Sequence, residues 1–276
     1  MTYREPLSQK AIAISISESA EMASLGLGPE HLRDAMAEVA RHLLAMGARL
    51  VYGGDLRAGG FTELLFELAT RHHRDADEGD FRSAVVNYLA WPIYASKPTD
   101  YLKNLAVELQ GLAELHFLDR QGGEVPLGTI KEAPLPGATD EEWSESLTAM
   151  RNLLTKVSHA RIVLGGRTEG YKGRMPGIAE EALLALHAGQ PLYLLGGYGG
   201  CSRDIAVEIG LMQTTSSEAA IWAGREEFQA FNRTALRNGL TEEENHSLAK
   251  TAHVDEAVAL ILRGLLRVAG PFAGSK

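Results

Sequence analysis

The sequence has a single cysteine, Cys201, and no apolar run near the length of a membrane span. One thiol cannot form a disulfide within the chain, so a reducing cytoplasm is the expected location. A transmembrane helix needs about 20 apolar residues, and the polar residues 1–10 lack the apolar core of a signal peptide. We therefore expect neither a disulfide scaffold nor a membrane protein.

Positive charge is also scarce, with 27 Lys and Arg against 36 Asp and Glu, and a net charge of −9. A general nucleic-acid binder usually carries a basic face, so this composition argues against broad nucleic-acid binding. A small anionic ligand remains compatible, because backbone N–H groups and a few arginines bind phosphate even on an acidic protein. The chain has no zinc-type Cys/His spacing, and we expect neither a metal site nor a cofactor.

Short apolar runs predict the strands of a buried sheet. They cover residues 11–16, 49–54, 83–90, 113–118, 160–166 and 191–197. The runs are continuous and do not alternate with polar residues, which is typical of parallel strands covered on both faces.

Amphipathic patterns between these runs predict helices over residues 30–46, 60–72, 140–157, 177–188, 202–211 and 255–270. Thr139 is the expected N-cap of the third of these helices. The alternation of strands and helices predicts an α/β fold with a doubly wound, mainly parallel, Rossmann-like sheet and C-terminal helices.

The chain divides into two parts by pattern. Residues 1–211 hold the strand–helix alternation and predict a Rossmann-like ligand-binding domain. Residues 212–276 carry no strand pattern and predict a helical extension that packs on the same domain. Residues 119–138, rich in Gly and Pro, predict a surface excursion.

Three predicted strands end in Gly-Gly pairs, each followed by an arginine within a few residues. The pairs are Gly53–Gly54, Gly165–Gly166 and Gly196–Gly197, and the arginines are Arg57, Arg167 and Arg203. Carboxyl ends of parallel strands meet at one edge of the sheet, where such folds bind ligands. Glycine allows close approach of backbone, a helix N-terminus favours an anion, and arginine binds phosphate bidentately. The three turns therefore predict a nucleotide-like site.

The loop GGRTEGYKGRMPGIAEE (165–181) combines flexible backbone with positive charge and paired carboxylates. Lys172 and Arg174 are candidate phosphate ligands. Gly177, which opens the following helix, is also a candidate ligand-binding residue. Glu180 and Glu181 either stabilise the first turn of that helix, or contact a ribose or act in glycosidic cleavage.

Other candidates follow the strands directly. Ser15 and Ser17 either bind phosphate or ribose, or satisfy backbone groups in the turn. Asp55 either contacts the ligand or pairs with Arg57. Tyr198 is a candidate for stacking on a base. Cys201 opens a helix, a position that lowers a thiol pKa, but has no adjacent histidine in the sequence.

These residues resemble the SLOG superfamily. This group includes the lonely-guy phosphoribohydrolases, the DNA-processing protein A fold, the N-terminal region of melastatin-type channels and nucleotide-sensing domains of bacterial defence systems. The resemblance lies in IAISIS (12–17), LVYGGDLRAGGF (50–61), IVLGGRTEGYKGRMPGIAEEAL (162–183) and PLYLLGGYGG (191–200).

The phosphoribohydrolases carry a PGGxGTxxE signature, and the resemblance places its glutamate at Glu181. Here Ile178 takes the threonine position, and a charged insert separates Gly-Gly from the helix. This departure favours the binding members, which sense NAD-derived or cyclic nucleotides. The expected function is therefore binding of a ligand such as ADP-ribose, in a homo-oligomer that acts on a separate effector protein in defence or signalling. The alternative is hydrolysis of the N-glycosidic bond of a nucleotide by Glu181 or Glu180.

Overall fold

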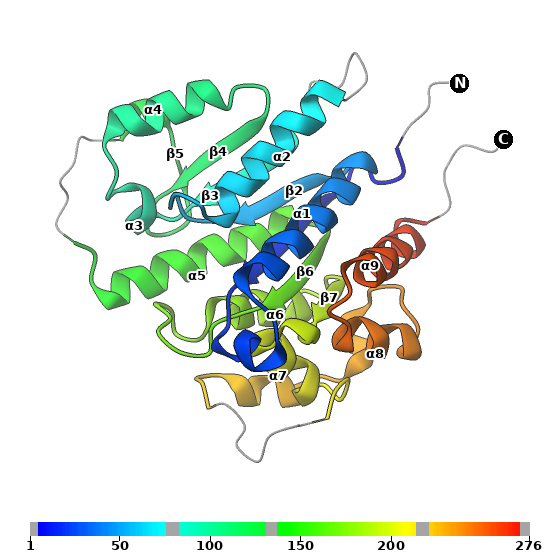
Figure 1. Ribbon diagram of the computed structural model, residues 1–276. Coiled ribbons are helices and arrows are strands. Elements are labelled where there is room, and N and C mark those ends of the chain that lie inside the picture. Colours follow the sequence, from blue (N-terminus) through cyan, green and yellow to red (C-terminus); the bar gives the residue numbers. More distant parts are fainter. Residues whose placement is uncertain (1–4, 76–82, 131–136, 214–220, 271–276) are drawn as a thin grey trace.

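A computed structural model describes residues 5–75, 83–130, 137–213 and 221–270. One seven-stranded sheet runs through it in the order β5-β4-β3-β2-β1-β6-β7, and only β5 is antiparallel to its neighbour (Figure 1). The strands are β1 (Ala11–Ser17), β2 (Arg49–Gly53), β3 (Val85–Leu89), β4 (Ala113–Leu118), β5 (Glu124–Val125), β6 (Ala160–Gly165) and β7 (Leu192–Leu195). The α/β prediction is confirmed, and all six predicted strands are present.

Helices connect the strands and cover both faces of the sheet. They are α1 (Pro29–Ala45), α2 (Phe61–Asp75), α3 (Trp91–Tyr94), α4 (Thr99–Glu108), α5 (Asp140–Val157), α6 (Gly177–His187), α7 (Gly200–Glu208), α8 (Glu242–Lys250) and α9 (Val254–Ala269). Thr139 caps α5 as predicted, because its side chain accepts the Glu142 N–H and the Glu142 carboxylate accepts the Thr139 N–H. None of the described helices is both long and apolar enough to cross a bilayer.

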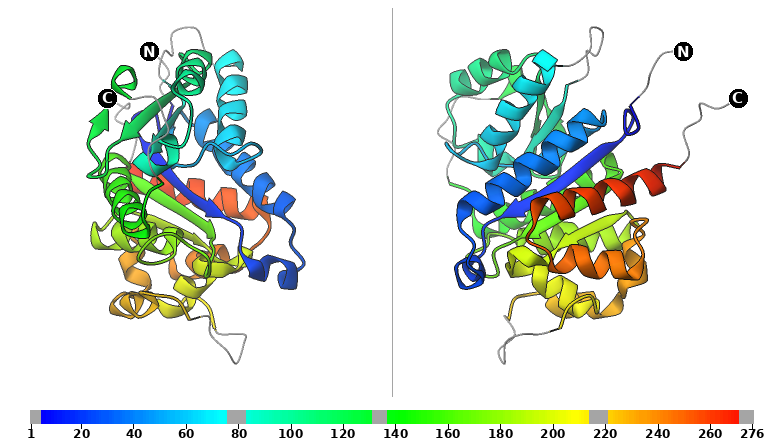
Figure 2. Two further views of the ribbon diagram at one scale, coloured as in Figure 1. Left: turned by 90° about the vertical axis from the view of Figure 1, so that its left-hand side faces the viewer. Right: turned by 45° about the vertical axis from the view of Figure 1, so that its right-hand side comes forward.

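The period of two along β1 assigns its side chains to the two faces. Ile12, Ile14 and Ile16 pack in one cluster with α1, α2 and α9, and Figure 2 shows α1 and α9 side by side on this face. Ala13 points the other way and packs with α5. Val163 of β6 packs with α6 in a further cluster. Ser15 lies two residues after Ala13, and Arg161 lies two residues before Val163. Both polar side chains are therefore on the face of the sheet that α5 and α6 cover.

The strand order reverses next to β1, whose neighbours are β2 and β6. Open parallel sheets bind ligands beyond the carboxyl ends of the strands, near such a reversal. The turns after β2, β6 and β7 all leave from this same edge, because the three strands are parallel. The fold therefore brings the three glycine turns to one edge, as predicted.

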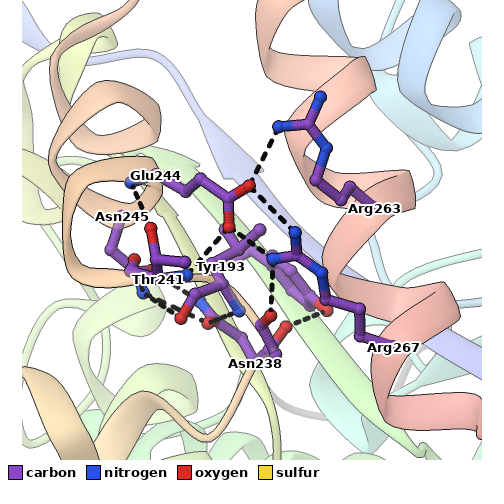
Figure 3. A network of polar contacts seen from close by, with 9 residues as sticks. Tyr193, Asn238, Thr241, Glu244, Asn245, Arg263 and Arg267 are labelled. Atoms are coloured by element: carbon purple, nitrogen blue, oxygen red, sulfur yellow. Dashed lines mark hydrogen bonds and ion pairs between the residues drawn. The ribbon is translucent and has the colours of Figure 1, made fainter.

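Residues 221–270 pack beside β7 through a buried polar network (Figure 3). The Asn238 side-chain amide donates to the Leu192 carbonyl and to the Asn245 side chain, both at 2.8 Å. The Tyr193 hydroxyl donates to the Asn238 carbonyl at 2.8 Å. A buried amide that bonds both to the sheet and to the C-terminal segment fixes the position of one against the other.

Glu244 joins α8 to α9 in the same network. Its carboxylate accepts from Arg263 at 2.9 Å and from Arg267 at 2.5 Å, and it also caps the Thr241 N–H (Figure 3). These charge-assisted bonds hold the two C-terminal helices together.

Three elements were not predicted, and the short helix α3 (Trp91–Tyr94), directly after β3, is one of them. α4 lies in a stretch that the sequence pattern left unassigned, and its Leu102 is fully buried. β5 forms inside the predicted surface excursion, where Phe117 pairs with Val125 across a tight turn around Gly122 and Gly123. Residues 119–130 nevertheless lie at the surface as predicted, because none of them is buried, whereas residues 131–136 lie outside the described part.

Candidate functional site

A pocket of about 540 Å³ lies at the carboxyl ends of the central strands. The turn after β2 and the loop after β6 form two of its walls, and α3 with residues 96–97 and α5 form the others. Seven predicted site residues line it: Gly53, Gly54, Asp55, Arg57, Arg167, Lys172 and Glu181. We refer to it as the turn pocket.

Positive charge dominates the turn pocket although the whole chain is acidic. Its lining includes five cations, namely Arg57, Lys97, Arg151, Arg167 and Lys172, and two carboxylates, Asp55 and Glu181. Five minus two leaves a formal charge of +3 on the lining. A concave site with this excess attracts and holds an anion.

Aromatic side chains complete the lining. Trp143 and Tyr171 both face the turn pocket. The Lys172 ammonium lies 4.2 Å from the centre of the Trp143 ring, in a cation–π contact. A flat ring and an ammonium at one spot suit a ligand that has both a heterocycle and a negative charge.

Glu181 reaches the turn pocket from α6 and is held from behind by the sheet. Its carboxylate accepts from Arg161 at 2.7 Å and from the Ser15 hydroxyl, and Arg161 also donates to Ser15 at 2.8 Å. The Glu181 side chain is 12% exposed and that of Arg161 is 1% exposed. Burial lowers the pKa of Arg161, and the Glu181 charge opposes this shift. Ser15 therefore orients Glu181 from a buried position and does not itself line the pocket.

Glu180, the neighbouring carboxylate, is fully buried and is not among the residues that line the turn pocket. It accepts from Arg151, from Thr148 at 2.6 Å and from Arg174 at 2.9 Å. Burial by itself would raise the pKa of Glu180, but the Arg151 charge and these three hydrogen bonds lower it overall. Glu180 is thus a structural anion that fixes Arg151, which does line the turn pocket.

Gly177 begins α6 as predicted, but it does not line the turn pocket. A Cβ at this position would meet the Arg151 guanidinium at 2.6 Å, so glycine admits that side chain to the start of α6. Arg174 pairs with Glu180 and is not among the lining residues of the turn pocket. Both residues support the site from behind its wall.

The third glycine turn lies under the C-terminal segment. A Cβ on Gly196 or Gly197 would collide with carbonyl oxygens of Ala249 or Thr251 at the end of α8. Tyr198 is 1% exposed, and its hydroxyl donates to the Ala252 carbonyl at 3.3 Å. These three residues are therefore packing residues in this structure, away from the turn pocket.

The start of α7 packs on the turn that follows β6. The Gly166 N–H donates to the Ser17 carbonyl at 2.8 Å, and the Cys201 N–H donates to the Gly166 carbonyl at 3.1 Å. Gly166 has a φ of 111°, which only glycine adopts readily. Ser17, Gly165 and Gly166 thus shape the loop that carries Arg167 without lining the turn pocket themselves. Burial raises the pKa of the Cys201 thiol to about 12, contrary to the lowering expected at a helix start.

Sequence reasoning missed four residues of this region: Trp143, Arg151, Arg161 and Lys97. Arg151 lies between Met150 and Leu154 on the buried side of α5, and Arg161 lies within the apolar strand β6. A cation inside an apolar pattern requires a buried partner, so this signal was available in the sequence. Asp55 pairs with Arg57 at 2.5 Å, one of the two alternatives considered.

The fold agrees with the comparison to known families. A model of the SLOG cluster2 family matches residues 6–252, and membership of this family indicates a nucleotide-related function. A search among curated proteins finds no match to the chain. The chain belongs to the SLOG cluster2 family.

Proposed function

We propose that the protein binds a nucleotide-derived ligand, of the ADP-ribose or cyclic nucleotide type, in the turn pocket. The observation that carries this proposal is the lining itself, in which five cations and two aromatic side chains surround one cavity on an acidic protein. A phosphorylated sugar would interact only with the cations of the pocket, whereas a nucleotide interacts with the cations through its phosphates and with the aromatic side chains through its base.

The ligand groups can be assigned by chemistry. Arg57, Arg167 and Lys172 donate to phosphate oxygens. The base stacks on Trp143 when Lys172 moves from the ring to a phosphate. Glu181 accepts hydrogen bonds from ribose hydroxyls, with Arg161 holding its carboxylate in place.

Binding without turnover is favoured by the state of Glu181. One of its carboxylate oxygens already accepts from both Ser15 and Arg161, which leaves that oxygen poorly placed to activate a water. Glycosidic hydrolysis is the second candidate function, and the partial exposure of Glu181 beside Arg151 favours it. On that alternative, Glu181 stabilises the ribosyl centre while the glycosidic C–N bond breaks. A water molecule then supplies a hydroxyl to the anomeric carbon and a proton to the departing base.

We also propose that ligand binding is transmitted to a separate effector protein in a signalling or defence role. The Tyr171 hydroxyl accepts the Ala223 N–H at 3.3 Å, which links the loop of the turn pocket to the C-terminal segment. A shift of this loop on binding therefore reaches residues 221–236. The same shift can change contacts between copies of the chain, so the ligand should alter the oligomeric state.

The two candidates are separated by following binding and products together. The protein is incubated with nucleoside monophosphates, NAD⁺, ADP-ribose and cyclic nucleotides, and each mixture is examined by thermal shift and by product chromatography. A ligand that raises the melting temperature and is recovered unchanged supports binding. Free base that accumulates with wild type but not with Glu181→Gln establishes hydrolysis instead, while Arg41→Ala in α1 serves as a surface control.

A further inference from the structure

A second pocket, of about 690 Å³, lies between α2 and α4. It shares three lining residues with the turn pocket, namely Leu56, Arg57 and Lys97. We refer to it as the helix pocket. The two cavities are therefore neighbours, and the cations Arg57 and Lys97 stand at the boundary between them.

The helix pocket has the opposite charge once the shared boundary is set aside. Its own lining holds three carboxylates, Glu63, Glu67 and Glu108, and no lysine or arginine. Phosphate would be repelled by these carboxylates, so the anionic part of a ligand belongs on the other side of the boundary.

The remaining surface of the helix pocket is apolar and aromatic. Phe66 from α2 faces Tyr101 and Leu105 from α4 across it. The Tyr101 side chain is exposed, with 42% of its surface accessible. An exposed aromatic side chain over an apolar floor is suited to a planar ring.

Thr62, at the border of the helix pocket, has an unpaired hydroxyl. It lines the helix pocket, is 3% exposed, and its hydroxyl has no hydrogen-bond partner. The same hydroxyl lies against Gly54, which lines the turn pocket. Buried hydroxyls normally have a partner, so a bond to a polar ligand atom would stabilise the Thr62 hydroxyl once this side chain turns toward the helix pocket.

We propose that the helix pocket is a second subsite, which takes the uncharged or cationic ring at the far end of a dinucleotide. This inference rests on the proposed function and specifies its ligand class. The first nucleotide occupies the turn pocket, the phosphates pass Arg57 and Lys97, and the second ring lies between Phe66 and Tyr101. Carboxylates around the second ring favour a cationic heterocycle over a neutral one.

Three probes that differ only at the far end test this assignment by titration calorimetry. NAD⁺ carries a cationic ring, NADH the corresponding neutral ring, and ADP-ribose none. We expect NAD⁺ to bind about tenfold more tightly than ADP-ribose. A factor of about ten is what one cation–π contact between the cationic ring and an aromatic side chain contributes to affinity. NADH should fall between the two.

Variants of the helix pocket make the test specific. Tyr101→Ala should reduce the affinity for NAD⁺ to that for ADP-ribose and leave ADP-ribose binding unchanged. Glu67→Gln should narrow the difference between NAD⁺ and NADH. Val107→Ala is the matched control, because Val107 is exposed on the same helix and does not line the pocket.

The outcomes separate this inference from the function on which it rests. If ADP-ribose binds and NAD⁺ binds no more tightly, the second subsite is wrong while the turn pocket stands. The same holds if Tyr101→Ala weakens all three probes equally. If none of the three probes binds but a cyclic nucleotide does, the second subsite is wrong while the turn pocket stands. If the cyclic nucleotides fail as well, the proposed function is overturned, and the second subsite with it.

Discussion

Arg161 and Glu181 form a 2.7 Å ion pair between strand β6 and helix α6, with the arginine side chain 1% exposed. The arginine comes from the sheet and the carboxylate from the helix that follows it, so the pair joins the two elements that flank the loop of the turn pocket. Two nitrogens of Arg161, Nε and Nη2, have no hydrogen-bond partner. The arginine therefore depends on Glu181 and Ser15 for its stability inside the fold.

Removal of one member of this pair should destabilise the protein more than removal of both. Arg161→Met leaves Glu181 only the more distant Arg151, whose Nε lies 3.8 Å from its carboxylate, and removal of one partner of a buried pair typically costs about 3–5 kcal/mol. In the double variant Arg161→Met/Glu181→Gln no charge is stranded, and part of this loss should be recovered. Urea unfolding of the two single variants and the double variant measures the coupling. Strictly additive losses would show that the pair is not a unit.

Acid should weaken the attachment of the C-terminal helices through Glu244. Hydrogen bonds from Arg267, Thr241 and Arg263 lower its pKa from the ordinary value of 4.5 to about 2. Since the folded-state pKa is the lower one, the carboxylate contributes stability above about pH 4.5, and this contribution is lost as the pH falls toward 2. Glu244→Gln should be less stable than wild type at pH 7 and should approach it at low pH. A difference independent of pH would contradict this role for Glu244.

The Cys201 thiol should be unreactive in the folded protein. It is fully buried, it donates to the Arg167 carbonyl at 2.9 Å, and burial raises its pKa to about 12. Reaction with a disulfide reagent at pH 8 should therefore follow opening of the fold, and a ligand that holds Arg167 should slow it. The reaction rate with and without ADP-ribose, monitored by absorbance, measures this. Rapid labelling of native protein would refute the buried assignment.

Asn238 should be a stability residue of the C-terminal segment. Its side chain is the buried link between β7 and α8, since it bonds to Leu192 and Asn245. Asn238→Ala leaves these two acceptors unpaired, at a cost of about 1–3 kcal/mol. Thermal unfolding of this variant beside Asn152→Ala, an exposed amide on α5, checks the expectation. Equal melting temperatures for the two variants would exclude it.

Much of the fold could be predicted because its signals are local. The apolar runs, the Thr139 cap and the Gly-Gly pairs each depend on a few neighbouring residues. The partnership of Arg161 with Ser15, 146 residues away, depends on tertiary structure. The same is true of the third glycine turn, which was expected at the site but lies beneath residues 249–251. Local sequence patterns identified the glycine turns that share one edge of the sheet. They did not show that a later segment of the chain covers the third of these turns.

The central claim is that an anionic nucleotide binds through the cations of the turn pocket. Titration calorimetry of ADP-ribose into wild type, Arg167→Ala and Arg41→Ala tests it most directly. The account predicts saturable binding that Arg167→Ala weakens by about tenfold, as expected for loss of a charged hydrogen bond, and that Arg41→Ala leaves unchanged. Equal affinity of all three proteins for ADP-ribose would contradict the assignment of the turn pocket.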